Sequence, residues 1–178
     1  MRRSTFVASG GFRESYARPS IEDIELGYRL TDSGARIILD PAIQVQHLKR
    51  WTFWSMLKTD VLDRGIPWAL LMLERRHAPD DLNLRTSQRL STVLAWLLVA
   101  SVMAAVGRQD WRLLFGALLS GALIVLLNLD FYRFLAKRRG LLFTSAAIPL
   151  HMLYHFYNGV SFVVAVFRHL FHRSGPVE

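Results

Sequence analysis

The residues of this 178-residue chain that could carry chemistry fall into four groups. They are a glycine pair, a carboxylate pair, a lone histidine before a basic and aromatic run, and two histidines four residues apart: Gly10-Gly11, Glu22-Asp23, His47, and His151 with His155. Cysteine is absent, which excludes disulfides, thiolate metal sites and cysteine nucleophiles. Each group has a structural as well as a chemical interpretation, and the elements that position it decide between the two.

The glycine pair lies on a predicted loop and the carboxylate pair at a predicted helix start. In Ser9-Gly10-Gly11-Phe12, paired glycines permit backbone conformations and a close ligand approach that a Cβ atom would block. The run from Pro19 to Leu30 predicts a helix with Ser20 as its N-cap, and Asp23 follows at capping-box spacing. From spacing alone, Asp23 is either a first-turn carboxylate favoured by the helix dipole or a functional acid.

Two strands are predicted after the turn at Ser33-Gly34. The first covers Arg36 to Asp40 and stops at Pro41, and the second covers residues 43–47, where apolar residues and His47 alternate with glutamines. At the end of that strand His47 is either a hydrogen-bonded structural residue or a ligand.

The segment from Trp51 to Arg64 combines aromatic and aliphatic residues with cations. It predicts a helix on a membrane surface, with its aromatic residues toward the lipid tails and its cations toward lipid phosphates. Gly65 is expected to end this helix, and Pro67 to open another short apolar helix. We therefore expect amphipathic interfacial helices over residues 51–89.

The C-terminal half has the composition of a membrane region. Hydrophobic residues make up 52% of the chain, its mean hydropathy is +0.22, and three long runs in the second half carry no charge. A spanning helix needs about 20 apolar residues. We expect a membrane region over 90–178 with three spans, at about 90–107, 112–129 and 142–167. This pattern excludes an ordinary soluble globule and a disordered chain.

Cations flank the predicted spans unevenly. Four precede the first span, two lie in the first loop and four in the second: Arg75, Arg76, Arg85 and Arg89; Arg108 and Arg112; and Arg133, Lys137, Arg138 and Arg139. Because Lys and Arg are retained on the cytoplasmic side, the N-terminal region and the second loop are expected inside. The net charge of +8 then mostly reflects the cations that orient the spans in the membrane, and no nucleic-acid partner is expected.

His151 and His155 would share one helical face within the third predicted span. Ionisable groups inside a membrane are candidates for function. The zinc-protease pattern is not met, because Met152 occupies the position that requires a glutamate. A polar seam against another helix, a lining of the route of a substrate and a metal site remain open.

Four motifs in order resemble the C-terminal part of membrane-bound family 2 glycosyltransferases. They are Gly10-Gly11-Phe12, Ile21-Glu22-Asp23, Arg36 through Pro41, and His47-Leu48-Lys49-Arg50-Trp51, followed by membrane helices. The resemblance is close over residues 9–73 and architectural beyond them. It implies an α/β fold class, a partial GT-A domain with the acceptor-side helix and strands over residues 1–50, followed by a helical membrane region of about three transmembrane helices.

The resemblance implies an inverting glycosyltransferase that moves a sugar from a nucleotide-sugar donor to a lipid or polysaccharide acceptor. It places the catalytic base on Asp23, since a hydroxyl is a poor nucleophile until its proton is removed. Substrate-binding roles fall on Gly10, Gly11, Phe12, Glu22, Arg50 and Trp51. Arg50 would neutralise the departing nucleoside diphosphate, and Trp51 would stack on the acceptor.

For His47 the resemblance implies two roles. The histidine is similar to one that helps hold a divalent metal, Mg or Mn, on the donor diphosphate in the complete enzyme. It also occupies the Gln position of a Q-x-x-R-W pattern that Arg50 and Trp51 otherwise match, a departure that weakens a processive interpretation.

No Asp-x-Asp metal motif occurs in the sequence. We therefore expect a C-terminal fragment that is inactive alone and that comes from a misplaced start, a truncated gene or a split subunit. In the last case the missing N-terminal half is a partner on a separate chain. The alternative is a non-catalytic three-span membrane anchor or partner subunit. Both interpretations predict an integral membrane protein in contact with membrane lipid, and we expect a bacterial inner membrane with the catalytic side cytoplasmic.

Overall fold

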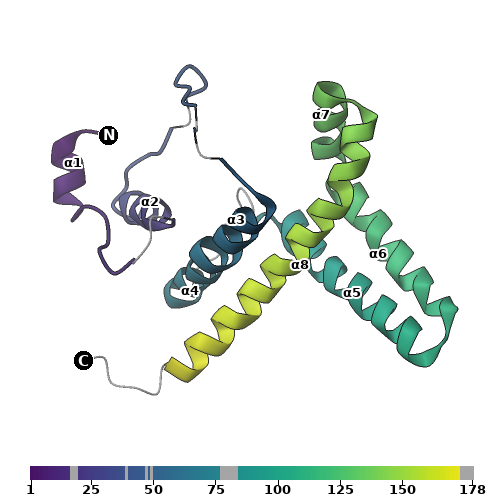
Figure 1. Ribbon diagram of the computed structural model, residues 1–178. Coiled ribbons are helices and arrows are strands. Elements are labelled where there is room, and N and C mark those ends of the chain that lie inside the picture. Colours follow the sequence, from purple (N-terminus) through teal and green to yellow (C-terminus); the bar gives the residue numbers. More distant parts are fainter. Residues whose placement is uncertain (17–19, 39, 47, 49, 77–83, 173–178) are drawn as a thin grey trace. The chain divides into compact units, whose positions relative to one another are not determined.

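The computed structural model describes residues 1–16, 20–38, 40–46, 48, 50–76 and 84–172. Within these ranges every regular element is a helix and no strand forms (Figure 1). The predicted α/β fold class, with a partial GT-A domain, is therefore wrong for the part of the chain that the structure describes. Two compact units are present, one formed by Met1–Arg75 with Ala165–Glu178 and the other by Arg76–Val164, and each is described by itself.

The described residues of the two predicted strands form irregular segments, and their apolar side chains lie in solvent. Ile37 and Ile38 are 65% and 76% exposed, and Ile43 and Val45 are 75% and 88% exposed. Alternating apolar residues form a strand only where a neighbouring strand accepts their hydrogen bonds and a core covers one face. Neither condition is met by the described residues of this segment, so its strand propensity has no effect.

The N-terminal unit contains α1 (Arg3–Ala8), α2 (Glu22–Asp32) and a helical rod of three parts. The rod consists of α3 (Phe53–Lys58), η1 (Thr59–Gly65) and α4 (Ile66–Arg75). A capping box starts it: the Ser55 amide donates to the Thr52 hydroxyl at 3.1 Å, and the Thr52 amide donates to the Ser55 hydroxyl at 2.9 Å.

The rod does not end at Gly65, where the sequence predicted a break. Residues 59–65 wind as a π-helix and continue directly into α4. Pro67 lacks the amide hydrogen that an unbroken α-helix would use, which accounts for the wider winding before it.

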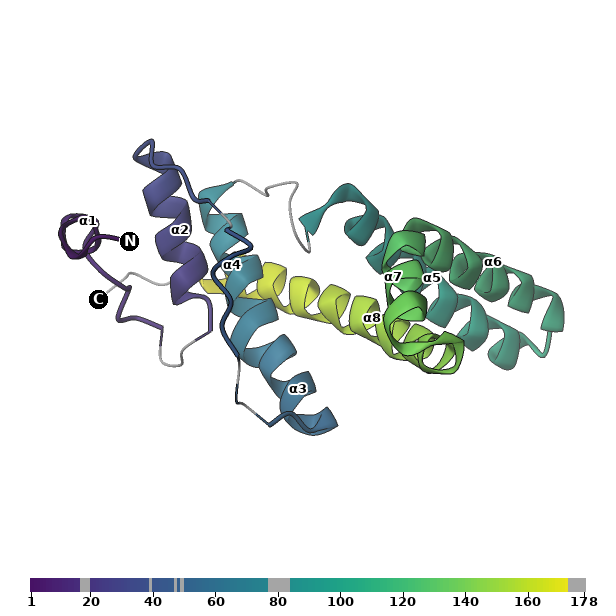
Figure 2. The ribbon, with the colours of Figure 1, turned by 90° about the horizontal axis from the view of Figure 1, so that it is seen from above.

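Side chains join α4 to α2. The Trp68 indole donates to the Tyr28 hydroxyl at 3.0 Å, and the Arg75 guanidinium pairs with Asp32. The same guanidinium lies 5.2 Å from the centre of the Tyr28 ring. Figure 2 shows α2 beside the rod, so these contacts place the two helices against each other within this unit.

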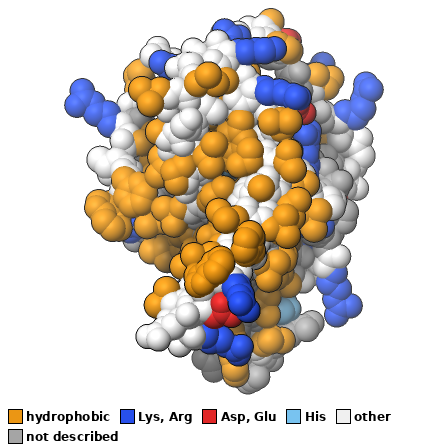
Figure 3. Space-filling model, turned by 90° about the vertical axis from the view of Figure 1, so that its right-hand side faces the viewer, with side chains coloured by type: hydrophobic (Ala, Val, Ile, Leu, Met, Phe, Trp, Pro, Cys, Tyr) orange, Lys and Arg blue, Asp and Glu red, His pale blue; other side chains and the backbone are white. Residues whose placement is uncertain are grey.

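The second unit is a hairpin of two helices with two more packed against it. It contains α5 (Thr86–Arg108), η3 (Trp111–Leu113), α6 (Leu114–Leu127), α7 (Leu129–Arg139) and the first part of α8 (Leu141–His172). Two helices, Thr86–Arg108 and Leu141–Phe171, are long and apolar enough to cross a membrane. A third crossing is present if the bent pair of 111–127 and 129–139 is one broken span. Hydrophobic side chains cover the middle of the face drawn in Figure 3.

The second predicted loop is helical. Arg133 to Arg139 lie in α7, which leaves α6 at an angle of 71°. The bend is at Asn128, a buried residue. Its amide nitrogen donates to the Ser91 hydroxyl at 2.9 Å and to the Ile124 carbonyl at 2.8 Å, and its oxygen accepts from Gln88 at 2.8 Å. Asn128 thus satisfies polar groups at the break and fixes α6 to the start of α5.

Helices α5 and α8 approach closely at Gly159. A Cβ atom there would overlap the Trp96 indole nitrogen and lie 3.1 Å from the Thr92 methyl group. If Trp96 moved away, it would lose two contacts with Phe156. Its indole donates to the Phe156 carbonyl at 3.2 Å, and the centres of the two rings are 5.1 Å apart. A residue without a side chain is therefore required at position 159.

We predict that Gly159→Ala lowers the free energy of unfolding by roughly 1–3 kcal/mol through overpacking. Unfolding of the detergent-solubilised protein, followed by tryptophan fluorescence, measures the change. Gly107→Ala is the matched control, since a Cβ atom meets nothing within 4 Å there and alanine favours the helix. Equal stability of the two variants would contradict the close approach.

Candidate functional site

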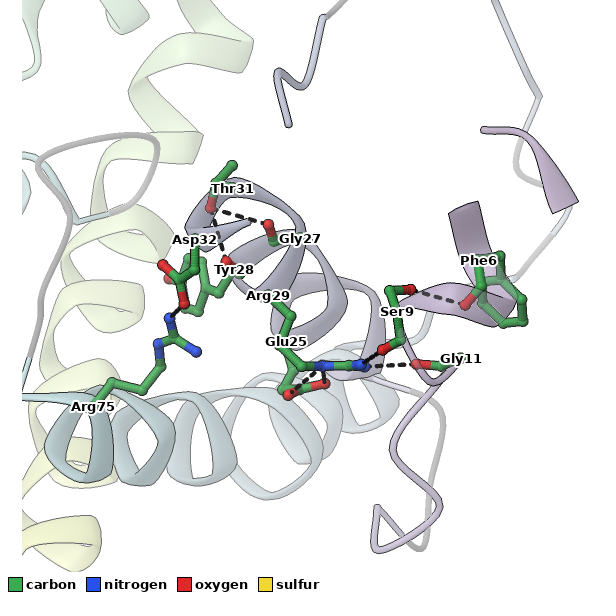
Figure 4. A network of polar contacts seen from close by, with 10 residues as sticks. All are labelled: Phe6, Ser9, Gly11, Glu25, Gly27, Tyr28, Arg29, Thr31, Asp32 and Arg75. Atoms are coloured by element: carbon green, nitrogen blue, oxygen red, sulfur yellow. Dashed lines mark hydrogen bonds and ion pairs between the residues drawn. The ribbon is translucent and has the colours of Figure 1, made fainter. Parts of the chain in front are cut away.

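The candidate site of the N-terminal unit is organised by Arg29, on α2 (Figure 4). The Arg29 Nε atom contacts both carboxylate oxygens of Glu25, at 2.8 and 3.0 Å. The other guanidinium nitrogens donate to the Ser9 and Gly11 carbonyls, the latter at 2.6 Å. Glu25 is only 4% exposed, so a buried carboxylate is neutralised by the same group that holds the glycine loop.

The glycine loop has the backbone conformation that the sequence predicted for it. Gly10 and Gly11 have φ angles of +81° and +66°, in the left-handed region that favours glycine. A Cβ atom on Gly11 would lie 3.4 Å from the Phe6 ring. Phe12 packs edge-on against Phe6, with ring centres 5.1 Å apart, and remains half exposed.

The carboxylate pair lies at the start of α2, but not through the predicted capping box. Ile21, rather than Ser20, is the N-cap, and Glu22 accepts the Ser20 amide hydrogen. Asp23 accepts the Ile24 amide hydrogen at 2.8 Å, and its side chain is exposed. The Asp23 carboxylate therefore contacts the helix start while it stays open to solvent.

The remaining predicted site residues are not gathered with this pair. Arg50 and Trp51 are exposed on the segment before α3, and among the described residues no hydrogen bond or ion pair connects Arg50 with Glu22 or Asp23. His47 lies outside the described residues. The structure thus brings the glycine loop to α2.

Two residues of the network, Glu25 and Arg29, were not predicted from the sequence. The i,i+4 spacing of Glu25 and Arg29 is a visible sign of an ion pair on a helix, whereas the contacts of Arg29 with Ser9 and Gly11 carry no local signal. Tyr16 is half-buried in the same unit. Burial raises the pKa of the Tyr16 hydroxyl, which therefore stays protonated near neutral pH.

The metal that the resemblance implies has no complete set of ligands in the described ranges. Within them no three His, Asp or Glu side chains lie close enough together to hold an ion. Glu22 and Asp23 direct their carboxylates to backbone amides instead.

The second unit holds the histidine pair. The Tyr132 hydroxyl and His151 Nδ1 are 2.9 Å apart, which joins α7 to α8. The rings of His151 and His155 are 4.5 Å apart, and His155 is 1% exposed with no hydrogen-bond partner for Nε2 in the part of the chain described. One of the two histidines thus forms a polar contact between helices, while two imidazoles alone do not complete a metal site.

Comparison of the chain with protein-family models, with curated proteins and with solved structures finds no match.

We predict that Arg29→Ala destabilises the protein by roughly 3 kcal/mol, because it leaves Glu25 buried without a partner. Urea unfolding measures the loss. Trypsin cleavage after Arg13 should also accelerate, because the loop loses its two hydrogen bonds to Arg29.

Two variants serve as controls. Arg64→Ala removes an i,i+4 pair whose atoms are 3.6 Å apart and whose arginine is exposed, and should change stability by less than about 0.5 kcal/mol. Adding Glu25→Gln to Arg29→Ala should recover part of the loss, since an amide is less costly to bury than a carboxylate. If the Arg29 and Arg64 variants behave alike, Arg29 does not hold the unit together.

Proposed function

We propose that this chain is the acceptor-side and membrane-embedded part of an inverting glycosyltransferase. In this proposal it helps to move a sugar from a nucleotide-sugar donor to a lipid or polysaccharide acceptor. The observation that carries the proposal is the Arg29 network. Through it the glycine loop and the helix of the Glu22-Asp23 pair, two of the motifs behind the resemblance, are held in one unit.

The chemistry of Asp23 supports a role as general base. Its exposed carboxylate lies in the first turn of α2. One of its oxygens accepts the Ile24 amide hydrogen, which orients the group, and the other can accept a proton from an acceptor hydroxyl. The proton is removed as the hydroxyl attacks the anomeric carbon and the nucleoside diphosphate departs.

The glycine loop would lie beside the substrates. With φ angles of +81° and +66° the loop turns tightly, and Gly10 and Gly11 present backbone without side chains. Half-exposed Phe12 offers an apolar ring next to it. Arg50 and Trp51 would join this group through a rearrangement of the exposed segment before α3, to meet the leaving diphosphate and the acceptor.

The membrane helices support an acceptor that resides in, or is handed to, the lipid bilayer. We propose that the N-terminal unit faces the cytoplasm of a bacterial cell, because cations are concentrated before α5 and on α7. No Asp-x-Asp motif occurs in the sequence. The nucleotide and any divalent metal, Mg or Mn, would therefore be bound by a unit outside these 178 residues.

We predict that Asp23→Asn lowers sugar transfer at least about 100-fold, the usual contribution of a general base. Membranes from the source cells, with the variant in place of the natural sequence, would be given labelled UDP-glucose, UDP-galactose, UDP-N-acetylglucosamine or GDP-mannose. Incorporation into lipid and polysaccharide fractions is the readout.

Asp32→Asn is the matched control on the same helix, because Asp32 pairs with Arg75 at its other end. Transfer should persist in that variant at equal protein level. Undiminished transfer by Asp23→Asn would remove the proposed base. Nucleotide release by the purified 20.4 kDa chain alone, lost in Asp23→Asn, would show that no further nucleotide-binding unit is needed.

A second candidate function is that of a non-catalytic membrane anchor or partner subunit. The observation that favours it is the irregular segment formed by the described residues of 34–38 and 40–46, where Ile37, Ile38, Ile43 and Val45 lie in solvent and are available to another protein. An immunoblot of source membranes with an antibody against the C-terminal tail gives the size of the natural chain. A band well above 20.4 kDa would favour the enzyme, and a band at that mass would direct attention to a partner.

A further inference from the structure

Helix α7 presents two kinds of side chain outward on neighbouring faces. Arg133 and Lys137 are four residues apart and share one face, and both are exposed. Phe131 and Phe134 are three apart and are 44% and 56% exposed. Arg138 lies over the Phe134 ring at 5.8 Å, on the same side of the helix as the two phenylalanines. A helix with these two faces has the pattern of a membrane-surface helix.

The inward side of α7 is held in place by polar contacts. Tyr132 is 4% exposed and its hydroxyl meets His151 on α8 at 2.9 Å. Asn128, directly before α7, is bonded to Ser91 and Gln88 at the start of α5. The 71° bend between α6 and α7 is therefore built into the packing of this unit.

The length of the preceding segment places α7 near a bilayer surface. Residues 111–127 rise by about 25 Å at 1.5 Å per residue, close to the hydrocarbon thickness of roughly 30 Å. Continuing α7 through the hydrocarbon would bury Arg133, Lys137 and the two arginines that follow, which is strongly unfavourable. A turn at Asn128 instead lets α7 run along the surface.

The two ends of this unit differ in charge. Asn128 and the start of α5 lie at one end, with exposed Arg85 and the α7 cations. Among the described residues at this end, one carboxylate is exposed, that of Asp130, which lies 3.6 Å from Arg133. The turn at the other end carries Arg108 and Arg112 with Asp110. The excess of positive charge is on the end that includes α7, and it complements a surface of negative charge.

We propose that α7 is an interfacial helix that binds anionic phospholipid headgroups. Arg133 and Lys137 meet the lipid phosphates, while Phe131 and Phe134 enter the outer part of the acyl chains. Lipid binding by these four residues does not depend on sugar transfer, and it goes beyond the proposed function.

The absence of cysteine allows a direct test by single-cysteine spin labelling of the reconstituted full chain. Labels at Arg133→Cys and Phe134→Cys would be compared in vesicles of phosphatidylglycerol and phosphatidylcholine. We expect the label at 134 to be accessible to oxygen, which dissolves in lipid, and the label at 133 to a water-soluble nickel chelate. Leu118→Cys on α6 and Glu14→Cys, both exposed, are the hydrocarbon and water references.

Both labels behaving like the water reference would overturn the proposal and favour a soluble acidic partner. Both behaving like the hydrocarbon reference would overturn it in favour of a broken span. Circular dichroism of each labelled variant confirms that its helices form before accessibility is compared.

Lipid specificity gives an independent measurement. Phosphatidylglycerol titrated into detergent-solubilised protein should raise its unfolding temperature, and phosphatidylcholine should not. Arg133→Gln with Lys137→Gln should weaken the apparent affinity about 25-fold, at roughly fivefold per cation. Arg108→Gln with Arg112→Gln, the same charge change at the other end, should leave it unchanged. Equal weakening in both pairs, or equal stabilisation by inorganic phosphate, would overturn the proposal.

Discussion

The architecture of the second unit depends on one constraint, that a backbone without water must find its hydrogen-bond partners inside the chain. Helices meet this constraint locally, and α5 and α8 are long and apolar enough to cross a membrane. The interruption between α6 and α7 is possible because Asn128 donates to the Ile124 carbonyl and also bonds to side chains on α5. The break is thus a satisfied polar junction, and it sets the direction of α7.

A related constraint governs the N-terminal unit. A buried carboxylate such as Glu25 is stable when a cation and hydrogen bonds accompany it. Arg29 supplies both, and its remaining donors contact the Ser9 and Gly11 carbonyls. One guanidinium therefore balances the charge of Glu25 and fixes the glycine loop, and the exposed Asp23 carboxylate lies on the same helix. The network that stabilises this unit therefore also holds in place the helix that carries the proposed base.

The errors of sequence interpretation at the site have particular physical reasons. Residues 36–40 and 43–47 carry strand patterns, yet an alternating pattern states only which face could be buried. The described part of this segment has no neighbouring strand and remains exposed. Ser20 has the spacing of an N-cap, but its amide donates to the Glu22 carboxylate, and the N-cap is Ile21, one residue later. Gly65 would end many helices, whereas here the winding widens and continues into α4.

The sequence by itself determined the features that depend on neighbours along the chain. These are the apolar helices of the second half, the positive-φ loop at Gly10 and Gly11, and a helix whose first turn carries Glu22 and Asp23. Tertiary structure alone decided what Arg29 contacts, where Asn128 finds its partners and which helix Tyr132 joins. Helical spacing is repeated locally and can be counted in a sequence. Contacts between residues 18 to 40 positions apart follow from packing, because a side chain's reach constrains distance in space and not separation along the chain.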